Sequence, residues 1–98
     1  MAPFNTPSIE RLFAAILQLK SAEECQAFFE DICTIKEVQD MAQRFDAAIL
    51  LDEGVAYQAI SEQVGISTAT ISRVSKCLNY GAGGYRRAID RLKEEESV

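Results

Sequence analysis

Apolar residues recur along most of this 98-residue chain at the three- and four-residue spacing of an α-helix. Near the start, one apolar stripe follows this spacing: Ile9, Leu12, Phe13, Ile16 and Leu17. The preceding Thr6-Pro7 pair supplies a capping hydroxyl and a proline suited to the first helical position. No stretch alternates apolar and polar residues with the two-residue period of a β-strand. The pattern therefore predicts an all-α fold.

Capping sequences predict where the next two helices start. Residues 21–24, SAEE, and residues 34–37, TIKE, both have the hydroxyl and glutamate spacing of a capping box. The second box begins a long helix that runs toward Leu51, and the Asp52-Glu53-Gly54 sequence ends it. The first half of the chain is therefore expected to hold three helices.

The second half predicts three shorter helices, at about 56–64, 68–79 and 84–94. Gly81 follows the second of these, and we expect it to take the left-handed conformation of a helix C-cap. The GAGG sequence at 81–84 follows no strand and lacks a Lys-Ser/Thr ending, so it is interpreted as a helix break rather than a phosphate-binding loop. Six helices in a single domain, residues 1–98, are the expected organisation.

The first three helices carry more apolar surface than a small bundle easily buries. Eight large apolar residues do not fit one stripe per helix: Phe13, Leu17, Phe28, Phe29, Ile32, Phe45, Ile49 and Leu50. Self-association is the physical outlet for such a surplus. The alternative is a monomeric bundle with exposed phenylalanines.

Charge is unevenly distributed along the chain, whose net charge is −5. Residues 1–64 sum to −7, whereas residues 65–93 sum to +5. A basic segment suits an anionic partner such as DNA, although a solvated face gives the same pattern. No apolar run reaches the roughly 18–20 residues of a membrane span, and the N-terminal MAPFNTPSIE contains no secretory signal. We therefore expect a cytoplasmic protein with no membrane partner.

The residue types argue against an enzyme. The chain has no histidine, so no imidazole is present to pair with a serine or cysteine nucleophile. The three cysteines, Cys25, Cys33 and Cys77, lack C-x-x-C spacing. We expect them to be reduced and buried as small hydrophobic side chains, without a disulfide. Neither a catalytic site nor a metal site is predicted.

Residues 57–74, YQAISEQVGISTATISRV, have the pattern of a helix-turn-helix. Gly65 lies at the turn, where a positive φ is needed and a side chain would obstruct. Ser61 is small where the two helices would cross, and Ser67 caps the second helix. Apolar residues occupy the anchoring positions on both sides of the turn: Ile60, Val64, Ile66, Ile71, Val74 and Leu78.

This anchoring leaves small polar and basic side chains on the outer face of the second helix. Small hydroxyl or methyl groups, which suit base edges in a major groove, occur at four positions: Ser67, Thr68, Ala69 and Ser72. Arg73 and Lys76 are long enough to reach phosphates, and Gln58 is placed to contact the DNA backbone or an adjacent base. Because serine and threonine are mediocre helix formers, an exposed face rich in them favours DNA reading over an ordinary helical hairpin.

Three segments together give this chain a family resemblance: MAQRFDAAILL at 41–51, GISTATISR at 65–73 and KCLNYGAGGYRRAID at 76–90. They resemble the Trp repressor superfamily and, more closely, the small Trp-repressor-like proteins of the YerC/YecD family. The resemblance covers about residues 8–93.

The resemblance implies a six-helix, all-α, intertwined homodimer. Residues 6–54 would supply dimerisation helices, residues 84–94 a C-terminal core helix, and residues 56–79 a helix-turn-helix head. The two heads of such a dimer would lie about one DNA turn apart, roughly 34 Å, which favours a palindromic operator.

The resemblance also suggests a ligand pocket. In Trp repressor, tryptophan lies between core and head, where two arginines sandwich the indole. Arg73 matches one of them by position, and Arg44 matches the other after a one-residue shift. Val74 and Cys77 replace a glycine and a serine beside the ligand, and valine fills space that the indole needs. We therefore expect no cofactor, tryptophan included, and consider these four residues a candidate pocket for another effector.

The sequence thus predicts a homodimeric transcriptional regulator of bacterial type, a repressor in the simplest case, that binds duplex DNA through its helix-turn-helix. Two other functions stay open. The acidic first half also suits a helix-turn-helix that binds a protein partner and has lost DNA binding. The second is a repressor gated by a small molecule other than tryptophan.

Overall fold

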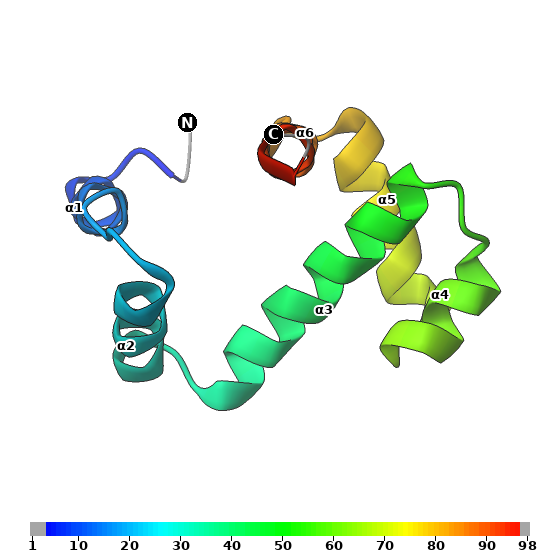
Figure 1. Cartoon of the computed structure of the whole chain (residues 1–98), viewed down its shortest axis with the longest axis horizontal. Coiled ribbons are helices and arrows are strands. Elements are labelled where there is room, and N and C mark those ends of the chain that lie inside the picture. The colour runs from blue at the N-terminus through cyan, green and yellow to red at the C-terminus, as the bar shows by residue number, and fades with distance from the viewer. Residues whose placement is uncertain (1–3, 97–98) are drawn as a thin grey trace. The chain divides into compact units, whose positions relative to one another are not determined.

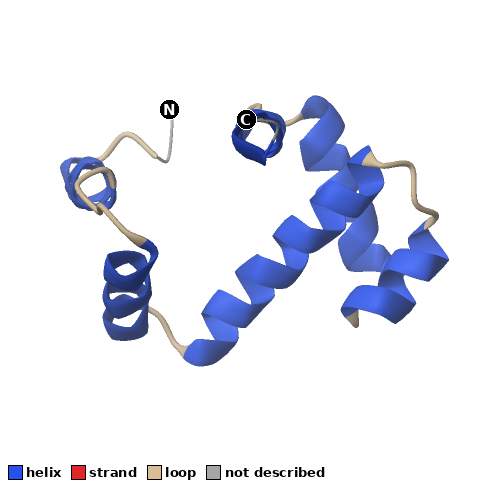
Figure 2. Ribbon diagram, viewed as in Figure 1, coloured by secondary structure: helices blue, strands red, loops and turns tan. Residues whose placement is uncertain are grey.

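The computed structural model describes residues 4–96, which form α-helices joined by loops and contain no strand (Figure 2). The helices are α1 (Pro7–Ile16), α2 (Ala22–Ile32), α3 (Ile35–Asp52), α4 (Tyr57–Val64), α5 (Thr68–Tyr80) and α6 (Gly84–Glu96) (Figure 1). The all-α prediction is confirmed. None of the helices in this range has the length and apolar character needed to span a membrane. The chain divides into two compact units, Met1–Val38 and Gln39–Val98.

The first unit contains α1 and α2, and both predicted caps form. The Thr6 hydroxyl accepts a hydrogen bond from the Ile9 amide at 3.2 Å, and the Ser21 hydroxyl accepts one from the Glu24 amide at 3.1 Å. No residue of either helix is buried, and Leu17 is 81% exposed. Large apolar side chains of this unit are therefore exposed, among them Phe13 and Leu17.

The capping box at the start of α3 is complete. The Thr34 hydroxyl accepts a hydrogen bond from the Glu37 amide at 3.1 Å, and the Glu37 carboxylate accepts one from the Thr34 amide at 2.8 Å. Hydrogen bonding to the Glu37 carboxylate, first from the Thr34 backbone amide and then from the Thr34 side chain, lowers the pKa of Glu37. The box sets where this 18-residue helix begins.

The core of the second unit lies among α3, α4, α5 and α6. Its buried residues are Ala47, Ala48, Ile60, Ile71, Val74, Leu78 and Ile89. Ala47 and Ala48, near the C-terminal end of α3, are fully buried in this core, and the helices that surround it are labelled in Figure 1. Phe45 of α3 stacks on Tyr85 of α6, with ring centroids 6.4 Å apart. The predicted helix-turn-helix, α4 and α5, therefore packs in one core with α3 and α6.

Asp52, the last residue of α3, is clamped by two cations from α6. Its carboxylate accepts hydrogen bonds from Arg86 Nη1 and Lys93 Nζ, both at 2.7 Å. Hydrogen bonds from Lys93 and then Arg86 lower the pKa of Asp52. The same contacts raise the pKa of Arg86 and of Lys93. The clamp ties the end of α3 to α6.

Two sequence-based expectations about conformation and burial are wrong. Gly81 has φ −86°, outside the left-handed region, and the positive φ of this loop falls on Gly83 instead. A Cβ at Gly81 would collide with the Cys77 carbonyl oxygen, so glycine is needed there for close approach. The expected buried cysteines are also not found. Cys25 and Cys77 are exposed and Cys33 is half-buried, because α2 has no buried face and Cys77 borders a pocket.

Candidate nucleic-acid interface

The two helices of the helix-turn-helix, α4 and α5, are anchored by buried aliphatic side chains. Ile60 of α4 and Ile71 of α5 are fully buried, and Val74 is 3% exposed. Gly65 ends α4 with φ +84°, and its amide donates to the Ser61 carbonyl at 2.9 Å. Only glycine adopts this backbone conformation at low cost, so the predicted positive φ is found. The expectation that a side chain would obstruct the turn is wrong, because no heavy atom lies within 4 Å of a Cβ at this position.

Two side chains hold the turn in addition to glycine. The Ser61 hydroxyl donates to the Ile66 carbonyl at 2.7 Å, and the Gln43 carboxamide donates from α3 to the Val64 carbonyl at 3.3 Å. We expected Ser61 only to be small, and sequence reasoning missed Gln43 entirely. A single sequence offers no signal for Gln43, because its partner is 21 residues away.

The N-terminus of α5 is organised by a chain of hydroxyl contacts. Ser67 caps the helix by accepting from the Thr70 amide at 3.1 Å, and its hydroxyl also donates to Thr70 Oγ1 at 3.0 Å. Arg73 Nη2 donates to the same Thr70 oxygen at 3.3 Å. Thr70 was not among the predicted site residues. The sequence does contain a signal for Thr70, because it lies three residues after the N-cap Ser67, which is the usual spacing of N-cap partners.

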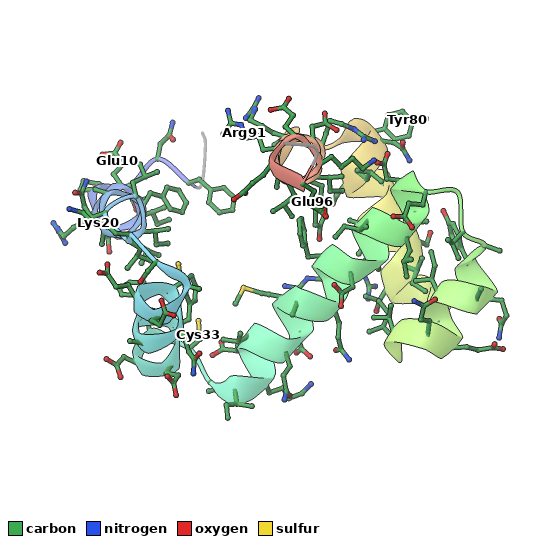
Figure 3. The ribbon with its side chains drawn as sticks, in the orientation of Figure 1. Glu10, Lys20, Cys33, Tyr80, Arg91 and Glu96 are labelled. Atoms are coloured by element: carbon green, nitrogen blue, oxygen red, sulfur yellow. The ribbon has the colours of Figure 1, made fainter. Side chains whose placement is uncertain are left out.

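The outer face of α5 is exposed along its length. Five predicted residues lie there with exposed side chains: Thr68, Ala69, Ser72, Arg73 and Lys76. Gln58 is exposed near the start of α4, where its amide lies 3.4 Å from the Glu62 carboxylate. Tyr80 ends α5 with an 86% exposed ring (Figure 3). The structure thus presents the predicted hydroxyl, methyl and basic groups to solvent.

The basic segment is only partly available to an external anion. Arg86 and Lys93 are held by Asp52, with Arg86 also 3.7 Å from Asp90. The other four cations of residues 65–93 form no ion pair with a carboxylate in the described part of the chain: Arg73, Lys76, Arg87 and Arg91. The positive charge open to solvent is therefore smaller than the sequence sum of +5 indicates.

A pocket of about 470 Å³ lies beside the inner edge of α5. All four predicted effector residues line it, together with five others: Arg44, Arg73, Val74 and Cys77, then Asp40, Gln43, Ile66, Thr70 and Tyr85. Neither Arg44 nor Arg73 forms an ion pair within residues 4–96. Two guanidinium groups beside apolar walls suit a small anion with an apolar part.

Among the described residues, no three cysteine, aspartate or glutamate side chains are grouped so that they could hold a metal ion.

These features, six helices with a helix-turn-helix and an arginine-lined pocket, define a helix-turn-helix regulator of the Trp repressor type. The chain matches the Trp repressor protein family over residues 7–93 and belongs to that family. A repressor family is regulatory rather than enzymatic. The chain is 53% identical over 89 residues to YerC, an uncharacterized protein of Bacillus subtilis (strain 168), covering 91% of this chain and 86% of YerC.

Two solved structures have the same fold with a TM-score of 0.89 each. One is a TrpR-like protein of Eubacterium eligens ATCC 27750, 50% identical, with 92% of this chain and 93% of that chain covered. The other is a Staphylococcus aureus protein provisionally described as a Trp repressor, 38% identical, with coverage of 95% and 96%. The predicted family resemblance and six-helix fold are confirmed.

Proposed function

We propose that this protein is a cytoplasmic, homodimeric repressor that binds a specific duplex DNA sequence through α4 and α5. The observation that carries the proposal is the exposed outer face of α5, where small hydroxyl groups lie beside cations that have no carboxylate partner among the described residues. Membership of a repressor family supports the same function.

The proposed roles follow from side-chain length and chemistry. Base edges are read by the short side chains: Ser67, Thr68, Ala69 and Ser72. The longer side chains of Arg73 and Lys76 contact phosphates and set the register of the helix, and Gln58 contacts the backbone from the start of α4. Because Ser67 already accepts from the Thr70 amide, its contribution is to place the start of α5 as well as to contact a base.

The proposed dimer is supported by the exposed apolar surface of the first three helices. Large side chains there are open to solvent, among them Phe13 at 45%, Leu17 at 81% and Ile35 at 74% exposure. A second copy covers these groups if residues 6–54 supply the dimerisation helices, with residues 84–94 completing the core. Two heads related by two-fold symmetry then favour a palindromic operator with half-sites about one DNA turn apart.

The experiment that tests this function is selection of bound duplexes from a randomised DNA pool at near-physiological salt. We expect an enriched palindrome, and we expect Thr68→Ala and Ser72→Ala to change its sequence more than the overall affinity. Absence of enrichment, with weak binding that disappears as the salt concentration rises, would contradict sequence-specific recognition. That result would favour a protein partner for the helix-turn-helix.

A second candidate function is gating by a small molecule, and the pocket carries it. The 470 Å³ volume and its two arginines suit a small carboxylate, and Val74 forms part of its wall. We expect one member of a panel of amino acids and other small carboxylates to raise the Tm. Arg44→Ala or Arg73→Ala should remove that increase. An increase that survives both substitutions would place the ligand elsewhere.

A further inference from the structure

A side chain of α3 satisfies the backbone where the chain leaves α4. The half-buried Gln43 carboxamide donates to the carbonyl of Val64, the last residue of α4, at 3.3 Å. Carbonyls in the last turn of a helix lack intrahelical partners and need one from elsewhere. Gln43 therefore connects α3 directly to the turn of the helix-turn-helix.

The other bonds at this turn do not make that connection. The Gly65 amide donates to the Ser61 carbonyl at 2.9 Å, and the Ser61 hydroxyl donates to the Ile66 carbonyl at 2.7 Å. All of these residues belong to the helix-turn-helix itself. Their bonds lie within the helix-turn-helix, whereas the bond from Gln43 joins the turn to α3.

Gln43 is shared by the linings of two hollows. Gln43 lines the 470 Å³ pocket and also a second hollow of about 290 Å³. The second hollow is bordered by α3 and the end of α4: Asp46, Ile49, Leu50, Gln63 and Val64. Ile49, Leu50 and Val64 also pack against the core, so the bond from Gln43 adds a hydrogen bond to this apolar contact.

We propose that Gln43 is a positioning residue that holds the helix-turn-helix turn on α3 and thereby sets the angle at which α5 meets DNA. The effect on DNA rests on the proposed function, whereas the restraint on the turn is independent of it. Gln63 provides a matched control. It borders the same second hollow, is exposed, and makes no side-chain hydrogen bond within residues 4–96.

Hydrogen exchange tests the restraint without DNA. In Gln43→Met, which keeps the side-chain length but removes the donor, we expect the Gly65 and Thr70 amides to exchange about fivefold faster, the effect of losing one hydrogen bond. The Ile89 amide in the core should exchange at the wild-type rate, and Gln63→Met should change none of these rates. Unchanged exchange at the turn, or equal acceleration at Ile89, would overturn the restraint.

Affinity for the selected duplex tests the consequence for DNA. We expect Gln43→Met to bind that duplex about fivefold more weakly with the same salt dependence, since no charge is lost. Gln43→Glu should bind the duplex more weakly than Gln63→Glu, which adds the same charge without facing the Val64 carbonyl. Local acceleration of exchange with wild-type affinity would overturn the role in DNA binding. A wild-type protein that selects no duplex would instead refute the proposed function, while the exchange result would still decide the restraint.

Discussion

At the residue scale, the turn of the helix-turn-helix depends on the left-handed backbone of Gly65. Its φ is +84°, and no heavy atom lies within 4 Å of the position of a Cβ. A substitution there is therefore penalised by backbone conformation and not by collision. We expect Gly65→Ala to lower the free energy of unfolding by about 1 kcal/mol, as measured by urea denaturation.

Gly84 is the control for this prediction. It also has open space at its Cβ position, but its φ lies outside the positive range and it starts α6. Gly84→Ala should leave stability unchanged or raise it, because alanine restricts the unfolded chain. Equal destabilisation by both substitutions would show that backbone conformation is not the reason.

A second prediction at this scale concerns Arg73. Its exposed guanidinium has no carboxylate partner among the described residues and donates to the Thr70 hydroxyl, so it is available to a phosphate. We expect Arg73→Ala to weaken binding to all duplexes and to reduce the salt slope by about one. Arg11→Ala in α1 removes the same charge outside the helix-turn-helix and should leave the slope unchanged. Loss of sequence preference with an unaltered slope would contradict the phosphate role.

At the element scale, the Asp52 clamp joins α3 to α6. Because its hydrogen bonds to Lys93 and Arg86 lower the pKa of Asp52, the charged carboxylate stabilises the folded state. This contribution is present above the ordinary carboxyl pKa of 3.8 and is lost as the pH falls through the lower folded value. We expect Asp52→Asn to lower the Tm at pH 7 by roughly 3–6 °C.

The difference in Tm between wild type and Asp52→Asn should shrink as the pH falls below about 4. Thermal melts followed by circular dichroism at several pH values measure it. Asp46→Asn is the control, because Asp46 is an exposed α3 carboxylate with no hydrogen bond or ion pair among the described residues. A Tm difference between wild type and Asp52→Asn that stays constant from pH 7 to pH 3 would exclude an electrostatic clamp.

At the scale of the whole molecule, the exposed apolar side chains of α1 and α2 predict association. We expect sedimentation equilibrium to give twice the chain mass of 10.9 kDa. Leu17→Glu places a charge on a side chain that is 81% exposed in the single chain and should raise the dimer dissociation constant at least about tenfold. Gln18→Glu adds the same charge at the next exposed position as a control. A wild-type mass of one chain at every concentration would refute the dimer.

Sequence reasoning was most successful where the signal was local. Helix starts followed from capping residues such as Ser21 and Thr34, whose partners lie three residues away. The turn glycine and the anchoring isoleucines Ile60 and Ile71 followed from fixed spacing. The expectation at Gly81 failed because the close approach of the Cys77 carbonyl, and not a left-handed φ, explains glycine at that position.

The sequence by itself therefore determined the all-α class, the six helices, the helix-turn-helix and the family, since short-range periodicity and capping encode all of these. Only the tertiary structure decided which polar groups pair across helices. In the structure, Arg86 and Lys93 of the basic segment donate hydrogen bonds to Asp52, and Gln43 donates one to the Val64 carbonyl. Such pairings join residues 21 to 41 positions apart, and they depend on how the helices cross in space, which helical periodicity does not specify.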